Sequence, residues 1–422
     1  MRSRLSPLTL ALAALLIVLA VIITAMLHYG LGVPRAETLA HHVDVLLAGT
    51  PGGDSWKPMA AAARFAAEQQ PGASIYEEIL FRRGMKFQYP PSALLFTSRL
   101  ERPALHVISW LAVWVTISVS VYLFDRGLRG SGYGPPGAVD GAVRLLIAAA
   151  LAATFYPLVK AYSLGQIQVW IDALFAVLVA SWGRKPALSG VCLGVMCLIK
   201  PQFALIGAWA LVRRQWRFAA VCAAVVLAGL SVSIAAYGWR SHVDYLRVLT
   251  FISERGETFY ANQSFNGLLN RLLFNGPNLE WQETAFAPPH RVVQAGTTLA
   301  GLVLIAAAWL APRRDRHGGL FDLAIVSVTA TAVSPVAWEH HYGILLPLFA
   351  ATAGETLRLK SFGAYTTIAL MLAFVLTGQF FQPLQRLAAT RFNFLQSYVL
   401  FGALLMLGLW YRVCRDLRQP SG

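Results

Sequence analysis

Apolar residues occur along the chain in long runs that are separated by polar and basic stretches. A helix that spans a bilayer needs about 20 predominantly apolar residues, and its backbone polar groups must be satisfied within the segment. The pattern therefore predicts an all-α polytopic integral membrane protein, a bundle of about 10 to 12 transmembrane or half-membrane helices. The predicted apolar segments are 7–27, 103–124, 144–158, 166–182, 218–237, 292–310, 320–333, 342–353, 364–380 and 394–410.

The first apolar run follows Arg2 and Arg4 and is longer than the apolar core of a signal peptide. We expect a retained membrane anchor whose N-terminus lies inside. Another run is interrupted at Lys200-Pro201, and the basic stretches 183–185 and 213–217 flank it on both sides. Proline breaks a continuous helix, and basic loops lie in the cytoplasm. This run is therefore predicted to form two short helices that enter and leave the same face.

Two long polar stretches, residues 28–88 and 238–290, fall on the predicted outer face. Both are too long to be mere connectors. In the second, an amphipathic helix is predicted along the membrane surface. We expect one domain over 1–422, with no separate soluble unit. The apolar side of the predicted surface helix comprises Phe265, Leu268, Leu269, Leu272 and Leu273, and its polar side Asn266, Asn270 and Arg271.

The composition narrows the class of protein. Hydrophobic residues make up 57% of the 422 residues and charged residues 13%, against roughly 25% charged in soluble domains, which excludes a soluble globular protein. Under the predicted topology the inner loops carry 18 Lys and Arg against six Asp and Glu, so they hold +12 of the net charge of +15. The excess indicates multi-pass orientation in a bacterial plasma membrane rather than a nucleic-acid partner.

Nucleotide-binding and metalloprotease motifs are missing from the sequence: there is no G-x-x-x-x-G-K-[ST], no strand followed by G-x-G-x-x-G, and no H-E-x-x-H. ATP-driven transport and zinc proteolysis are therefore disfavoured. The four cysteines form no C-x-x-C pair and are expected to be buried small side chains. The question of a divalent metal stays open, since no cluster of ligands compels one.

The first outer stretch places Asp54 directly after Gly52-Gly53 and just before a helical run. A carboxylate near a helix N-terminus can be held ionised and presented to a substrate. The same spacing also fits a residue that only caps the helix. Asp44 lies in the same stretch and is the second candidate.

Several short motifs occur together in an order that resembles glycosyltransferase family 87. This resemblance covers roughly residues 50–345 and rests on the joint order, since no single motif is decisive. Members of that family are polytopic GT-C glycosyltransferases, typified by polyprenyl-phosphate-mannose-dependent α-mannosyltransferases. The motifs are the Asp54 segment, Tyr89-Pro90-Pro91, Gly165-Gln166 before Asp172, Gly190 to Lys200-Pro201, Asn262-Gln263-Ser264, and the run from Ser334 to His341 that includes Trp338-Glu339-His340-His341.

The resemblance implies transfer of a hexose, mannose first of all, from a polyprenyl-phosphate donor to a lipid or glycan acceptor on the outer face. No cofactor is implied beyond this lipid-linked sugar. Asp54 matches the acidic residue that acts as general base in inverting enzymes of this kind. The expected donor-phosphate residues are His340, His341 and Arg271, and the expected substrate-binding residues are Tyr89, Gln166, Asn262 and Gln263.

Two other functions are compatible with the residues. Asp172 and Lys200 lie within apolar segments, where ionisable groups often mark transport pathways, so a secondary transporter that uses them as a coupling relay is the main alternative. The two long outer stretches and the absence of an inverted repeat speak against it. A non-catalytic scaffold for envelope assembly is the third interpretation.

Overall fold

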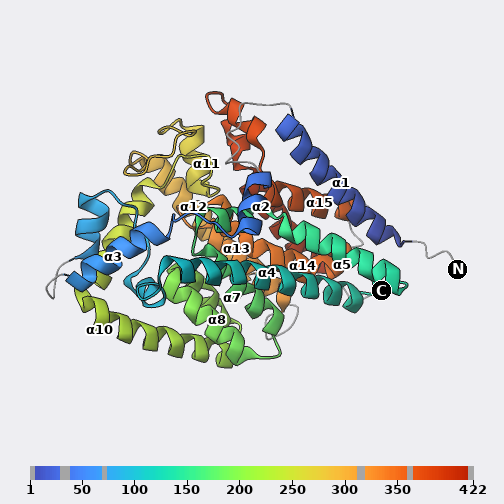
Figure 1. Cartoon of the computed structure of the whole chain (residues 1–422), viewed down its shortest axis with the longest axis horizontal. Coiled ribbons are helices and arrows are strands. Elements are labelled where there is room, and N and C mark those ends of the chain that lie inside the picture. The colour runs from blue at the N-terminus through green and yellow to red at the C-terminus, as the bar shows by residue number, and fades with distance from the viewer. Residues whose placement is uncertain (1–4, 29–38, 69–73, 311–318, 359–364, 417–422) are drawn as a thin grey trace.

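The structure is a computed structural model that describes residues 5–28, 39–68, 74–310, 319–358 and 365–416. Within these ranges it consists of helices and connecting segments without strands (Figure 1), which confirms the predicted all-α fold class. The α-helices are α1 (Pro7–His28), α2 (Leu39–Ala48), α3 (Trp56–Glu68), α4 (Arg102–Gly130), α5 (Ala138–Ala153), α6 (Tyr156–Leu164), α7 (Gln168–Ser181), α8 (Pro186–Ile199), α9 (Ala204–Val212), α10 (Trp216–Arg255), α11 (Phe265–Leu272), α12 (Arg291–Leu310), α13 (Leu320–Ala332), α14 (Leu345–Leu357), α15 (Tyr365–Gly378) and α16 (Tyr398–Asp416).

Short helical turns join several of these helices. One is a π-helical turn in the segment before α4, and the others are 3-10 turns next to α-helices. They are η2 (Glu77–Arg82), η3 (Pro91–Phe96), η4 (Pro201–Phe203), η5 (Glu339–Ile344), η6 (Gln382–Leu387) and η7 (Asn393–Ser397).

Four of the described helices are long and apolar enough to cross a membrane: α4, α10, α12, and α16 together with η7. The pair α5 and α6, bent by 47°, forms a fifth candidate span. Shorter apolar helices such as α7, α8 and α13 pack among them. Short apolar helices suit this environment because non-helical backbone at membrane depth is tolerated where protein surrounds it.

The predicted interruption at Lys200-Pro201 is confirmed. Helix α8 ends at Ile199, Lys200 is extended (φ −138°, ψ 98°), and α9 begins after the 3-10 turn η4. The α8 helix packs closely on α10, where a Cβ at Gly194 would lie 2.6 Å from Val225 Cβ. Small residues thus bring these two helices together.

The two large polar stretches contain more helix than a loop interpretation suggests. Helix α10 is 40 residues long and is kinked at Gly238 (φ 74°, ψ 153°), so it continues to Arg255 through a region predicted as loop from 238 onward. The glycine allows this positive φ, and the helix resumes after it. In the first stretch, α2, α3 and η2 are helical. We call residues 39–88 the first connecting segment and residues 256–290 the second connecting segment.

The predicted surface helix is present as α11, and its two sides face in opposite directions. Asn266, Asn270 and Arg271 are buried in the protein, whereas Leu272 and Leu273 are exposed. Phe265, Leu268 and Leu269 are half-buried, so only the C-terminal part of the apolar side faces outward. A buried polar side with exposed apolar residues is the reverse of an ordinary soluble helix. This arrangement agrees with a helix whose outer side meets the membrane interface.

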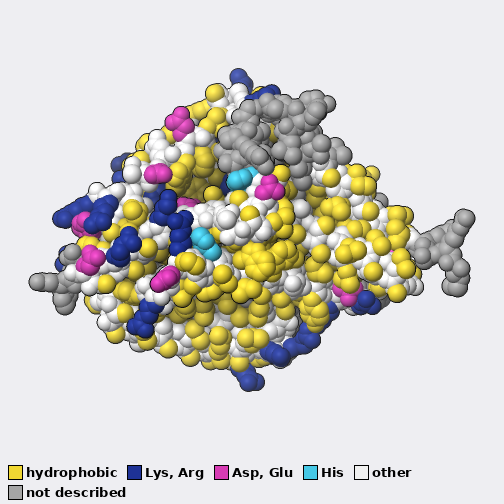
Figure 2. All heavy atoms as spheres, in the orientation of Figure 1, with side chains coloured by type: hydrophobic (Ala, Val, Ile, Leu, Met, Phe, Trp, Pro, Cys, Tyr) yellow, Lys and Arg dark blue, Asp and Glu magenta, His cyan; other side chains and the backbone are white. Residues whose placement is uncertain are grey.

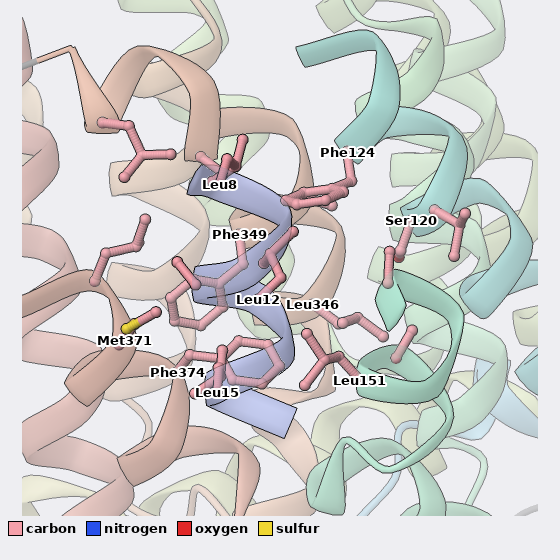
Figure 3. A pocket seen from close by; sticks show the side chains of 18 of the residues that line it. Leu8, Leu12, Leu15, Ser120, Phe124, Leu151, Leu346, Phe349, Met371 and Phe374 are labelled. Carbon is pink, nitrogen blue, oxygen red and sulfur yellow. The ribbon is translucent and has the colours of Figure 1, made fainter. Parts of the chain in front are cut away.

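Helix α1 packs against α5 and covers an apolar pocket of about 110 Å³ (Figure 3). Its side chains Leu8, Leu12 and Leu15 face Met371 and Phe374 of α15, and α4, α5 and α14 supply the remaining walls. The described part of α1 is therefore packed into the bundle by apolar contacts.

Charged side chains gather at one end of the molecule. Figure 2 shows Lys, Arg, Asp and Glu concentrated over the end where α3 lies, whereas apolar side chains cover much of the rest of that face. A broad apolar surface of this kind is expected where lipid surrounds the protein. A site that binds polar substrates is therefore expected at the charged end.

Candidate active site

The loop that carries Asp54 is fixed to the C-terminal end of α6 by backbone hydrogen bonds. The backbone N–H groups of Gly52, Asp54 and Ser55 donate to the carbonyls of Ser163 (2.8 Å), Leu164 (2.9 Å) and Gly165 (3.1 Å), respectively. These carbonyls are among those that a helix end leaves without intrahelical partners. The same contacts thus satisfy the end of α6 and place Asp54.

Glycine is required at position 165 for two reasons. Gly165 has φ 72°, the left-handed conformation that commonly ends a helix. A Cβ at this position would overlap the carbonyl oxygen of Gly52. The Gly165-Gln166 motif is therefore explained by the close approach of the two backbones.

Asp54, Gln166 and Tyr89 meet in one hydrogen-bond network, although more than 70 residues separate Tyr89 from Gln166. Gln166 Nε2 donates to Asp54 Oδ2, and Gln166 Oε1 accepts from Tyr89 Oη (3.2 Å). Ser55 Oγ lies 2.7 Å from Gln166 Oε1 and 2.8 Å from Tyr89 Oη, and it accepts from the Ile167 backbone N–H. Ser55 was not predicted as a site residue, and its place directly after Asp54 was the available signal.

The Asp54 side chain is exposed, yet the surrounding protein removes enough water to raise its pKa. The hydrogen bond from Gln166 opposes this rise, and so do the positive charges of Lys57 and Lys86. Helix α3 begins at Trp56, so Ser55 rather than Asp54 immediately precedes it. The described contacts thus give Asp54 a partner other than the helix that it was suspected of capping.

The second connecting segment packs against the first through a buried ion pair. Lys86 Nζ donates to Glu257 Oε1 and lies over the rings of Trp281 (3.9 Å to the centroid) and Phe286 (4.4 Å). Burial raises the pKa of Glu257 to about 7, against the opposing effect of Lys86. Lys86 also acts electrostatically on Asp54. Lys86 of the first segment and Glu283 of the second thus both lie near enough to the Asp54 carboxylate to act on it electrostatically.

The motifs around Asn262 and Trp338 lie side by side. An antiparallel bridge joins the two residues, and the Gln263 and Glu339 backbone N–H groups donate to Ala337 O (2.7 Å) and Ala261 O (2.9 Å). This pairing links the second connecting segment to the start of η5. Two motifs that are 76 positions apart in sequence thus form one structural unit.

Asn262 and Gln263 are fully buried, and their side-chain amides form hydrogen bonds with backbone groups. Asn262 Nδ2 donates to Glu257 O (2.9 Å), and its Oδ1 accepts from the Ala337 N–H. Gln263 Nε2 donates to Tyr260 O and to a carbonyl in η7. Their predicted contact with substrate stays a prediction, whereas their contacts with the chain stabilise the loop.

Arg271 lies fully buried on α11 and holds the same loop together. Its Nη1 donates to the backbone carbonyls of residues 258, 259, 260 and 262, and its Nη2 donates to Ser397 Oγ (2.6 Å). Each buried donor lost here would leave an acceptor unpaired. The guanidinium therefore shapes the second connecting segment, and its predicted contact with a donor phosphate stays a prediction.

His340 and His341 are buried in η5 and lie near Lys200. His341 Nε2 is 2.7 Å from Lys200 Nζ, which also donates to Gln168 Oε1 (2.7 Å). Gln168 Nε2 in turn donates to Asp172 Oδ1 (2.9 Å). Asp172 and Lys200, the two residues of the alternative transporter relay, are thus connected through the amide of Gln168.

A buried cation that the sequence interpretation missed lies beside this cluster. Lys160 Nζ donates to Tyr156 Oη (2.7 Å) and Glu339 Oε2 (2.8 Å), and Tyr398 Oη donates to Glu339 Oε1 (2.9 Å). A lysine inside an apolar run was the available signal, since such charges are rare and are usually paired. Its pairing with Glu339 holds α6 against η5.

Asp44, the second candidate base, lies exposed on α2. Across the part of the chain that the structure describes, no group of three or more His, Cys, Asp or Glu side chains is placed to hold a metal ion. All four cysteines are buried, as expected, and none of them forms a disulfide bond.

Comparison with known proteins gives a consistent set of relatives. A model of glycosyltransferase family 87 matches residues 87–335, more than half of the chain. The polyprenol-phosphate-mannose-dependent alpha-(1-2)-phosphatidylinositol pentamannoside mannosyltransferase of Mycobacterium tuberculosis is 27% identical over 270 residues, covering 63% of this chain and 57% of the relative. Its namesake from Mycolicibacterium smegmatis is 31% identical over 195 residues, covering 46% and 44%.

A polyprenol-phosphate-mannose-dependent alpha-(1-2)-phosphatidylinositol mannoside mannosyltransferase of Mycobacterium tuberculosis is 28% identical over 278 residues, covering 62% of this chain and 61% of the relative. The chain thus spans less than two thirds of the length of each of these relatives. No solved structure matches the chain.

Proposed function

We propose, from the premise that the chain belongs to glycosyltransferase family 87, that it transfers mannose from polyprenyl-phosphate mannose to a hydroxyl group of a lipid or glycan acceptor. The relatives named above use a polyprenol-phosphate-mannose donor. The observation that carries the proposal is the Asp54 carboxylate, which is solvent-accessible, hydrogen-bonded to Gln166 and within electrostatic reach of Lys86 and Glu283 in the two connecting segments.

Asp54 is the general base of the proposed reaction. Its carboxylate accepts the proton of the acceptor hydroxyl while the hydroxyl oxygen bonds to the anomeric carbon of mannose. The bond between that carbon and the phosphate oxygen breaks, and its electron pair leaves with polyprenyl phosphate. A pKa raised by lost hydration suits this role, because it brings the proton affinity of the base closer to neutral pH.

The donor phosphate is proposed to bind at His340, His341 and Lys200. His340 Nε2 and His341 Nδ1 are buried, and neither has a hydrogen-bond partner in the described structure. Buried polar atoms are normally paired, so a ligand oxygen would complete both. Lys200 donates to Gln168 and approaches His341, neither of which is a carboxylate. Its charge can therefore act on a phosphate.

The acceptor is proposed to reach Asp54 from the polar side of the molecule, where the charged residues gather. Tyr89 and Gln166 then lie next to the sugar and the acceptor hydroxyl. Asn262, Gln263 and Arg271 act by shaping the wall behind η5. We assign this side to the outer face of the plasma membrane, because the basic loops 183–185 and 213–217 are expected to face inward.

The test is transfer from radiolabelled polyprenyl-phosphate mannose in membranes that contain the wild type, Asp54→Asn or Asp44→Asn. Loss of the base should lower the transfer rate about 10²- to 10⁴-fold in Asp54→Asn. Asp44→Asn, which changes an exposed carboxylate of α2, should transfer like the wild type. Normal transfer by Asp54→Asn at equal protein level would overturn the assignment, and so would loss confined to Asp44→Asn.

A further inference from the structure

Two tryptophans lie against each other next to the proposed active site, and the proposed reaction uses neither. The ring centroids of Trp281 and Trp338 are 5.1 Å apart, and the ring planes make an angle of 75°. Trp281 is 41% exposed, and Trp338 is half-buried. Tryptophans that are partly open to solvent are common on binding surfaces. We call Trp281 and Trp338 the tryptophan pair.

The tryptophan pair reaches from the surroundings of Asp54 to η5. Lys86 Nζ lies 3.9 Å from the centroid of the Trp281 ring, and its charge acts on Asp54. Glu283, two residues after Trp281, acts on Asp54 as well. Trp338 directly precedes η5, which carries the two histidines of the proposed phosphate site. An acceptor whose hydroxyl lies at Asp54 therefore has the tryptophan pair within reach of its next unit.

The loop that carries Trp281 is fastened to the rest of the molecule on both sides of the ring. Before it, the backbone carbonyl of Asn278 accepts from the Tyr260 N–H (2.8 Å). After it, Thr284 packs closely on the first connecting segment, since a Cβ at Gly84 would lie 2.9 Å from Thr284 Cβ. A side chain that is held in place before a ligand arrives loses little freedom on binding.

The surroundings of Trp281 suit a sugar better than a lipid chain. Glu280, Gln282 and Glu283 are its neighbours in sequence, and all three are exposed. A sugar ring combines an apolar C–H face, which can stack on an indole, with hydroxyl groups that carboxylates and amides can bind. A lipid chain would remove water from these polar groups and offer no hydrogen bond in return.

We propose that the tryptophan pair binds the second sugar unit of an acceptor glycan that is at least two units long. The first unit places its hydroxyl at Asp54, and the second unit stacks on Trp281 with its hydroxyls toward Glu280 and Glu283. The inference rests on the proposed function for the reaction and adds the class of acceptor. Trp281 is thereby a specificity-determining residue that recognises the length of the acceptor and takes no part in proton transfer.

Two soluble acceptors separate the second sugar unit from the first, since methyl α-mannoside has one unit and methyl α-mannobioside has two. In the wild type the KM for the two-unit acceptor should be about tenfold lower, because stacking adds binding free energy. Trp281→Ala should raise this KM about tenfold and leave the KM for the one-unit acceptor within about twofold. Trp281→Phe keeps an aromatic ring and should retain most of the preference.

Trp239→Ala is the matched control. Trp239 is 68% exposed on α10, directly after the kink at Gly238, and its removal should change neither KM. A wild type without preference for two units would overturn the assignment, and so would a preference that persists in Trp281→Ala. Equal rises in both KM values would give Trp281 a purely structural role and would also overturn it. Thermal unfolding in detergent verifies that each variant is folded.

Failure of the proposed function would show itself differently, as absence of mannose transfer in membranes that contain the wild type. Saturation-transfer NMR with methyl α-mannobioside and the protein in nanodiscs then decides on the tryptophan pair by itself, and it also decides if neither methyl glycoside serves as an acceptor. The ring protons of the methyl-bearing unit should receive saturation from the wild type and Trp239→Ala, but not from Trp281→Ala. No signal with the wild type, or an equal signal with Trp281→Ala, contradicts the proposal.

Discussion

The Asp54 carboxylate is subject to two opposing influences. Lost hydration favours its protonated form, and the hydrogen bond from Gln166 favours its ionised form. The first effect is the larger, so the pKa is raised. As the proposed base, Asp54 must be ionised to accept a proton, so the Gln166 amide extends the range of pH in which it can act.

Replacing Gln166 with Met should therefore move the acidic limb of the activity profile to higher pH. Loss of the hydrogen bond raises the pKa of Asp54 further, so the ionised base disappears at a higher pH as the solution is acidified. Transfer measured as kcat/KM against pH gives the position of the limb. Lys57→Met should shift it in the same direction, because its charge also lowers this pKa. If the acidic limb of the pH profile stays in place in Gln166→Met, ionisation of Asp54 does not control that limb.

At the scale of elements, the proposed active site depends on how α6 ends. Three carbonyls at the end of this helix receive the backbone of the Asp54 loop, and the left-handed conformation of Gly165 directs the chain into Gln166. One helix end thus fixes both partners of the hydrogen bond between Gln166 and Asp54. The positions of Asp54 and Gln166 are well defined because backbone atoms, which have little freedom to rearrange, hold them.

Gly165→Ala should abolish most of the transfer activity by displacing this loop. The new methyl group would meet the Gly52 carbonyl, and the left-handed conformation adds roughly 1–2 kcal/mol of strain. Gly132→Ala is the matched control, since Gly132 has φ 83° but nothing within 4 Å of its Cβ position. Transfer rates and thermal unfolding of both variants are to be compared. Equal activity in the two would mean that the contact with Gly52 is unimportant.

At the scale of the whole molecule, sidedness follows from the charges and can be tested directly. All four native cysteines are buried, so the wild type offers little background for a thiol reagent. In the variant Arg82→Cys, the new thiol lies in the first connecting segment and should react with a membrane-impermeant maleimide in intact cells. In the variant Arg184→Cys, the new thiol lies in an exposed basic loop and should react with the same maleimide only after the membrane is opened. The reverse pattern would place the active site inside.

Much of the architecture follows from the sequence because apolar length and basic loops are local signals. The break after α8, the position of α4 and α12, and the two polar stretches were all predictable in this way. The continuation of α10 beyond Gly238 was not, because a glycine between an apolar and a polar region also fits a helix end.

The site was less predictable because its contacts join distant parts of the chain. Asp54, Tyr89 and Gln166 could be selected individually, but their common network depends on how α6 receives the loop. Lys160 and Glu339 form a buried pair that no short motif marks. The two side chains are 179 positions apart, so their pairing is a property of the tertiary packing. The periodicity of apolar residues along the sequence carries no information about such a contact.

The hydrogen bond from Arg271 to Ser397 has a consequence for the order in which the protein is assembled. The two residues are 126 positions apart. The side-chain amide of Asn393, also in η7, donates a hydrogen bond to the backbone carbonyl of Arg271. During synthesis the ribosome delivers the spans α4, α10 and α12 long before it delivers η7. A nascent chain can therefore be threaded into the membrane while the wall of its proposed active site is still incomplete, and that wall is completed only once η7 has been synthesised.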